Sequence, residues 1–366
     1  MQANSLKTLA IVVGIFFFTS NLSGSFLTVY YKKIGLSIPE IVTILLFTFP
    51  LIGLLPSILL RNVKNFERIM SFGIFFTMLF YVILIFVRNP IMLGLAYGLS
   101  TATFWPSFNL LQFRLGESKM RARTISFFSL VIPTLTSIVG PAAGGFTIEN
   151  FGFQKLFVTA VILYVIAFLL SLRIRFQPEA HKFSIPKNRT FIIFFLTFII
   201  LGFSEAYWLA YPLLVLGVSV TVLNMGVILA LSAILISIAT FLVNWLSDIK
   251  KTRAHFAVIG TMLNATWFFT LTFASKTYEI VGLSLLTGLA NAFNISWFAH
   301  YGDSFGKEHY ASILVLMEVG LMIGRIVNLA PTYVFITSAD YASYFRLSGV
   351  ILLFMIPLCV ASERKR

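Results

Sequence analysis

The chain has 366 residues, of which 58% are hydrophobic and only 11% are charged, and its formal net charge is +14. A soluble domain is about one-quarter charged, so this composition excludes an ordinary soluble protein and indicates a polytopic membrane protein. The single cysteine, Cys359, excludes an internal disulfide and a CxxC metal site. Because the sequence also has no GxSxG, HExxH or phosphate-binding glycine-rich loop, we expect no enzyme, no metal and no cofactor.

Apolar runs follow one another along the whole chain, each long enough to cross a hydrocarbon core about 30 Å thick at roughly 1.5 Å per residue. They predict an all-α integral membrane protein with twelve transmembrane helices and leave no room for a soluble domain. The runs lie near residues 8–30, 39–60, 69–87, 91–113, 124–147, 155–174, 190–215, 221–246, 254–274, 279–300, 311–336 and 342–361.

The placement of Lys and Arg decides what the positive net charge means. With the amino terminus inside, most basic residues fall in loops on the cytoplasmic side, as the positive-inside rule requires. We therefore expect a multi-pass protein of the plasma or inner membrane with both termini cytoplasmic, and no nucleic-acid partner.

An internal repeat divides the chain into halves. The turn at residues 34–37 recurs 182 positions later at residues 216–219, and an offset of 190 pairs Pro141 with Pro331. Repeats of this kind place a substrate site near the bilayer midplane, between the halves. We expect two pseudo-symmetric six-helix bundles over residues 1–174 and 190–366, joined by a polar cytoplasmic linker over residues 175–189.

The fifth apolar run ends in a glycine- and proline-rich segment, residues 140–145. A proline frees a backbone carbonyl and glycines let a neighbouring backbone approach, so we expect a kinked, tightly packed helix. In this position the segment resembles the major facilitator superfamily, and more narrowly the fifth-helix motif GxxxGPxxGG of its antiporters, with Thr136 in place of the first glycine. The resemblance implies a transporter that works by alternating access. It also implies gating roles for Gly140, Pro141, Gly144 and Gly145; the alternative is a helix contact without a role in transport.

A cytoplasmic loop signature of the same superfamily, G-x-x-x-D followed by basic residues, is recognisable at residues 244–253. The resemblance implies that Asp248 and Arg253 form a gate that locks the cytoplasmic ends of helices together. The first-half copy at residues 61–68 is degenerate, with Glu67 at the acid position only after a one-residue slip. The alternative for both loops is a plain positive-inside anchor.

Ionisable residues inside membrane spans cost roughly 2.5–3.5 kcal/mol on insertion scales, so they usually face a cavity or a partner. Glu205 lies in the seventh span, with Trp208 and Pro212 three and seven positions further on the same face. They predict an aromatic wall and a bend beside a carboxyl group suited to reversible protonation. The alternative is a protonated glutamic acid that only bonds a neighbouring helix.

Glu318 and Arg325 are seven positions apart on one face of the eleventh span, and Asn328 continues that face. Two helical turns separate them by roughly 10.5 Å, so we expect an electrostatic pair closed by their long side chains. In the functional interpretation Arg325 contacts an anion or carboxylate and Glu318 is its proton-sensitive counter-ion. The structural alternative is a buried pair that fixes helix packing.

The remaining candidates are amides and aromatic side chains on spans that resemble the cavity-lining helices of the superfamily. Aromatic walls with a few amides suit an amphipathic or apolar ligand. With Arg325, the predicted substrate-binding residues are Asn21, Trp105, Asn109, Trp208, Asn291 and Asn294.

The leading hypothesis is a monomeric secondary transporter that uses protons to export an amphipathic small molecule. Because the first half has no mid-span carboxylate, proton coupling is expected at Glu205 and Glu318. The first alternative is uptake or facilitated diffusion of a sugar, amino acid or organic anion, with weak pH dependence. The second is a membrane sensor or lipid-handling protein that does not transport a solute.

Overall fold

The computed structural model describes the chain with several short gaps, and every regular element in the described ranges is a helix, which confirms the predicted all-α class. The chain packs into two compact units, unit 1 (residues 1–182 and 220–230) and unit 2 (residues 183–219 and 231–366). The described ranges are 2–62, 65–115, 128, 131–175, 185–205, 207, 209–219, 221–250, 253–305 and 309–363.

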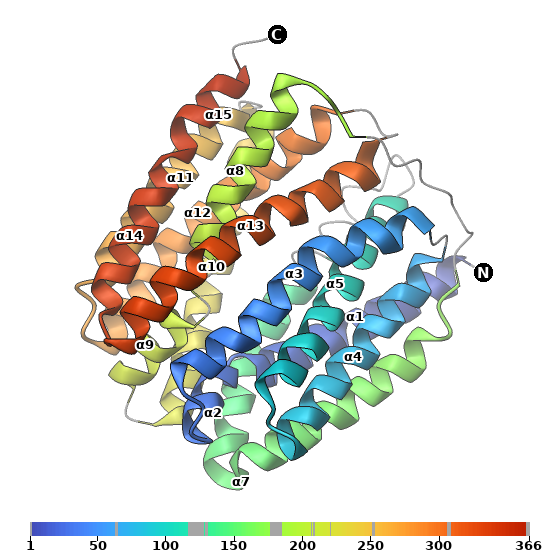
Figure 1. Cartoon of the computed structure of the whole chain (residues 1–366), viewed down its shortest axis with the longest axis vertical. Coiled ribbons are helices and arrows are strands. Elements are labelled where there is room, and N and C mark those ends of the chain that lie inside the picture. Colours follow the sequence, from blue (N-terminus) through green and yellow to red (C-terminus); the bar gives the residue numbers. More distant parts are fainter. Residues whose placement is uncertain are drawn as a thin grey trace. The chain divides into compact units, whose positions relative to one another are not determined.

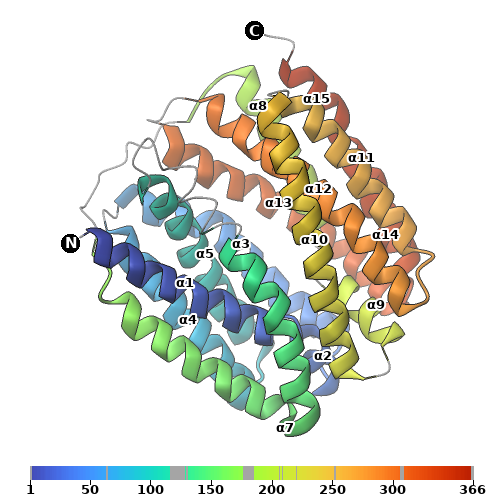
Figure 2. The same cartoon turned by 180° about the vertical axis from the view of Figure 1, so that it is seen from behind.

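Unit 1 begins with a membrane helix that is interrupted near its end and continues as a short second segment. The helices are α1 (Gln2–Gly24), α2 (Leu27–Lys33), α3 (Ile38–Asn62), α4 (Phe66–Phe86), α5 (Pro90–Leu115) and α7 (Ile132–Ser171). The last of these, α7, consists of two helical arms joined by a turn at Gly152. It packs against α1 and α4, and α4 in turn lies against α5 (Figures 1 and 2).

Unit 2 also begins with an interrupted helix. Its first part, α8, packs against α13, α14 and α15, while α11 packs against α12, α14 and α15 (Figure 1). The helices are α8 (Arg189–Glu205), α9 (Ala210–Val218), α11 (Arg253–Leu271), α12 (Thr277–Asp303), α13 (Tyr310–Thr337), α14 (Tyr341–Leu353) and α15 (Met355–Glu363). Helix α10 (Val222–Lys250) begins in unit 1 and continues into unit 2.

Eight stretches of the described chain are long and apolar enough to cross a membrane. One of them, Ile132–Ser171, covers two of the predicted spans. Helices α5, α11 and α12 coincide with the predicted spans at residues 91–113, 254–274 and 279–300. The helices therefore follow the predicted succession of membrane spans.

The break between α8 and α9 is encoded by Pro212. Proline has no backbone N–H and clashes with the carbonyl four residues earlier in a continuing helix. The new helix starts at Ala210, which places Pro212 in its first turn. There the missing N–H needs no partner. The structure thus gives two separate helices, α8 and α9, on either side of the predicted bend, with Pro212 in the first turn of the second.

Candidate functional site

The backbones of α8 and α13 touch through glycines. A Cβ atom added to Gly202 would lie 2.7 Å from the Cα atom of Leu321, and one added to Gly324 would lie 2.6 Å from the backbone nitrogen of Phe203. Gly320, one turn before Gly324, faces the Cβ atom of Phe198. Small residues four apart let two membrane helices approach this closely. The contact brings the last turn of α8 against the middle of α13.

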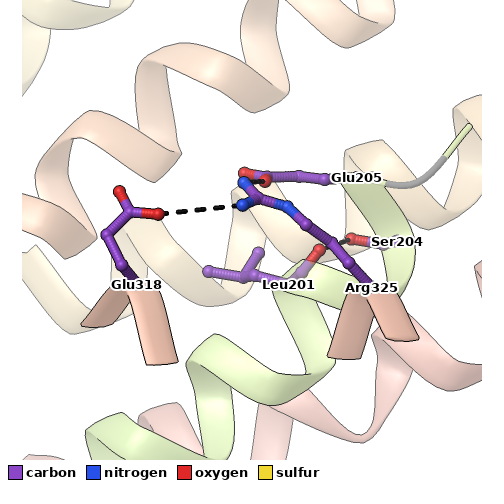
Figure 3. A network of polar contacts seen from close by, with 5 residues as sticks. All are labelled: Leu201, Ser204, Glu205, Glu318 and Arg325. Carbon is purple, nitrogen blue, oxygen red and sulfur yellow. Dashed lines mark hydrogen bonds and ion pairs between the residues drawn. The ribbon is translucent and has the colours of Figure 1, made fainter. Parts of the chain in front are cut away.

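Three charged side chains meet beside this contact. The Arg325 Nη2 atom donates a hydrogen bond of 2.8 Å to Oε2 of Glu205, and Arg325 Nη1 lies 3.7 Å from Oε2 of Glu318. Figure 3 shows the guanidinium group of Arg325 reaching both carboxylates from the α13 side. The predicted pairing of Glu318 with Arg325 is present, and Glu205 is a second acid in the same cluster.

The three members of this cluster differ in their exposure. The side chains of Arg325 and Glu318 are 9% and 13% exposed, whereas that of Glu205 is 43% exposed. Glu205 is therefore the most exposed member of the cluster. Its pairing with Arg325 was not predicted, because the two residues are 120 positions apart in the sequence.

An aromatic cluster follows Glu205. The ring of Tyr207 meets those of Trp267 and Tyr211 edge-on, with centroid distances of 5.4 Å and 6.1 Å. Trp267 belongs to α11 and is buried. Aromatic side chains thus do lie next to Glu205 along the chain, while Trp208, the aromatic residue predicted from the sequence, falls outside the described residues.

Unit 1 has a neutral pair at the corresponding place. Near the end of α1, Asn21 Nδ2 donates a hydrogen bond of 3.2 Å to Thr136 Oγ1 on α7. A Cβ atom added to Gly140 would lie 2.6 Å from the Cβ atom of Asn21, and one added to Gly144 would clash with the Leu22 carbonyl. The two units thus join an interrupted helix to a glycine-bearing partner in the same manner, with uncharged groups in unit 1 and charged groups in unit 2.

The other two residues of the fifth-helix motif face the first turns of α10. Gly145 approaches the Val222 carbonyl and the Cα atom of Leu223, and the Pro141 carbonyl lies against Gly226. All of these residues belong to unit 1. The expected tight packing of this segment is therefore present on two sides.

Two of the other predicted site residues, Trp105 and Asn109, lie on α5 in unit 1. Trp105 is 38% exposed, and its ring meets those of Phe17 and Phe108. Asn109 lies one turn further along α5 and is half-buried. The side chains of Asn291, Asn294, Asp248 and Arg253 fall outside the residues whose side chains are described.

Glu67, the degenerate acid of the first loop copy, is buried in the first turn of α4. With Arg68 and Arg175 it lines a cavity of about 570 Å³, and Ser71 and Ser171 are also among the lining residues. Their hydroxyl groups are 2.7 Å apart and join α4 to α7. Among the described residues, no group of three His, Cys, Asp or Glu side chains is placed to hold a metal ion.

Comparison with known proteins gave one family. The model of the Major Facilitator Superfamily matches residues 9–190 and 193–366, which together cover nearly the whole chain in two halves. A search of curated proteins gave no match.

Proposed function

Because the chain belongs to the major facilitator superfamily and is therefore a multi-pass membrane transporter, we propose that it exchanges protons for an amphipathic small molecule. The cluster of Glu205, Arg325 and Glu318 is the proposed coupling site. Superfamily members are transporters rather than enzymes, so we assign the cluster a role in binding and releasing protons during transport.

The observation that carries this proposal is that two carboxylates share one guanidinium group. With both acids ionised, the cluster has two negative charges and one positive charge, and its net charge is −1. A net charge in a low-dielectric setting is costly. One proton or one monovalent cation at Glu205 neutralises the cluster, so proton binding and cation binding compete for the same site.

The burial of Arg325 favours this mechanism over uptake of an organic anion. An anionic substrate needs an accessible guanidinium group, but the Arg325 side chain is 9% exposed and already pairs with two acids. Glu205, in contrast, is exposed enough to exchange its partner. We therefore assign proton coupling to Glu205, with Glu318 as the second acid that keeps Arg325 paired when Glu205 is neutral.

The remaining parts of the proposal rest on resemblance. The fifth-helix motif is similar to that of antiporters, which supports export and a gating role for Gly140, Pro141, Gly144 and Gly145. Asn21 and Trp105, on α1 and α5, are the substrate contacts that we propose in unit 1. We place the protein in the cell membrane as a monomer with both termini cytoplasmic.

Reconstitution in sealed vesicles that contain a pH-sensitive dye tests the proposal. Cationic amphipathic compounds, sugars and organic acids are added in turn, and proton movement is recorded for the wild type, Glu205→Gln and Glu149→Gln. Glu149 is an exposed acid of α7 and serves as the matched control. We expect proton flux with the cationic class only, lost in Glu205→Gln and retained in Glu149→Gln.

Two outcomes would contradict the proposal. Transport of a ligand without proton flux, equal in the wild type and in Glu205→Gln, indicates a facilitator. Transport that responds to organic acids and is lost in Arg325→Gln but not in Glu205→Gln assigns the site to an anion instead.

A further inference from the structure

We infer that Asn328 is a positioning residue that holds the last turn of α8 against α13, so that Glu205 meets Arg325. No role was predicted for Asn328 beyond its place on the face of α13 that carries Glu318 and Arg325. The importance of this role for transport rests on the proposed function, whereas the positioning itself does not.

Asn328 is fully buried, and both ends of its amide are bonded. Its Nδ2 atom donates to the Phe203 carbonyl at 3.0 Å, and its Oδ1 atom accepts from Thr332 Oγ1 at 2.6 Å and from the Tyr344 hydroxyl at 2.9 Å. A carbonyl oxygen can only accept a hydrogen bond, so the atom that faces Phe203 must be the nitrogen. The orientation of the amide is therefore fixed by its partners.

The hydrogen bond from Asn328 reaches the backbone of α8 itself. Its acceptor, the Phe203 carbonyl, lies two positions before Glu205, the last residue of α8. A bond to the backbone holds the helix regardless of side-chain rotamers. Within the membrane, bonds of this kind from polar side chains join neighbouring helices. Asn328 therefore ties this turn of α8 to α13 beside the point where Glu205 meets Arg325.

The distances along the two helices explain why this bond positions the ion pair. Asn328 lies three residues after Arg325 on one face of α13, and Phe203 lies two residues before Glu205. The hydrogen bond from the Asn328 side chain and the Arg325–Glu205 ion pair therefore join the same turn of α13 to the same turn of α8. Thr332 and Tyr344 restrain the amide in turn, and Tyr344 extends the connection to α14.

Labelling with a hydrophobic carbodiimide such as dicyclohexylcarbodiimide reports whether Glu205 is paired with Arg325, and it does not require a transport assay. The reagent adds to a protonated carboxyl group, and pairing with a guanidinium group favours the ionised form. The full chain is labelled in nanodiscs at one pH near neutrality. Peptide mass spectrometry then gives the labelling rates of Glu205 and Glu318 separately. Glu318 is the internal reference, since it lies on the same helix as Arg325 and keeps this partner when the α8 contact loosens.

We expect Asn328→Ala to accelerate labelling of Glu205 by about tenfold, the usual size of a lost buried hydrogen-bond partner. The rate at Glu318 should not rise, because Glu318 keeps Arg325 to itself. Tyr344→Phe should act in the same direction to a smaller extent. Thr261→Val is the matched control, because it removes a buried hydroxyl group of α11 that bonds only within its own helix. That variant should label as the wild type does.

Equal acceleration at Glu205 and Glu318 in Asn328→Ala would overturn the inference, because it indicates general loosening of the unit. An unchanged rate at Glu205 would overturn it as well. Where the alanine variant does not fold, the ratio of the two rates in Tyr344→Phe decides in the same way. If the ratio of the Glu205 and Glu318 labelling rates changes but the wild-type protein shows no proton flux, the positioning role is supported and the proposed function is wrong.

Discussion

Substitution of Gly324 by alanine tests whether the backbone contact between α8 and α13 sets the geometry of the ion pair. The added Cβ atom would clash with the Ile199 carbonyl oxygen, and it would lie 2.6 Å from the Phe203 nitrogen and 3.0 Å from the Gly202 carbonyl carbon. These are backbone atoms, which cannot rotate away. Normal contact needs about 3.4 Å, so the contact at Phe203 alone requires the helices to separate by at least about 0.8 Å. The Arg325–Glu205 distance of 2.8 Å would then exceed the hydrogen-bonding range.

Overpacking of this kind costs about 1–3 kcal/mol. Gly282→Ala is the matched control, because Gly282 lies in a helix of the same unit and has no atom within 4 Å of the added Cβ atom. It should stabilise by about 0.5–1 kcal/mol through the better helix propensity of alanine. The assay is thermal unfolding in detergent, followed by tryptophan fluorescence, together with the carbodiimide labelling rate of Glu205. Equal unfolding temperatures and equal labelling rates for the two variants would refute the reasoning.

Four further variants test individual contacts by thermal unfolding. Arg325→Gln should lower the free energy of unfolding by about 3–5 kcal/mol, because it leaves the buried Glu318 carboxylate without its cation. Glu205→Gln should lower it less, because Arg325 keeps Glu318 as a partner. The reverse order would contradict an arrangement in which two acids share one cation. Asn21→Ala should lower the free energy of unfolding by about 1 kcal/mol, because it removes the hydrogen bond to Thr136 on α7. An unchanged unfolding temperature would show that this hydrogen bond does not contribute to stability. The hydroxyl and backbone N–H of Ser343 hold the pKa of the Asp340 carboxyl below its usual range. The stability that Asp340 adds as the N-cap of α14 is therefore present above about pH 4 and lost at lower pH, so the wild type and Asp340→Ala should differ at neutral pH and converge in acid.

Much of the fold was predictable because membrane spans follow from hydrophobic length alone. The run at residues 69–87 became α4 (Phe66–Phe86), and Pro212 lies in the first turn of α9, where a proline suits the start of a new helix. The sequence also pointed to the charged residues inside spans, and the structure brings Glu205, Glu318 and Arg325 together. A buried charge is costly wherever it lies, so its presence in an apolar run indicates a partner without identifying it.

The identity of the partner was not predictable from the same pattern. Spacing along one helix suggested Glu318 as the partner of Arg325, and that contact is the longer of the two at 3.7 Å. The shorter contact, to Glu205, depends on how α8 and α13 cross. A signal for this crossing was present in the sequence, since Gly320 and Gly324 are spaced four apart and directly precede Arg325.

The turn at Gly152 has a consequence for how the protein is made. Helix α7 reverses direction there without a separate loop, at a backbone φ of +81° that favours glycine. Its two arms are therefore joined without a connecting loop that could absorb strain. A residue with a side chain at this turn is disfavoured by the positive φ, so we expect such a substitution to lower the yield of inserted protein before it affects any transport.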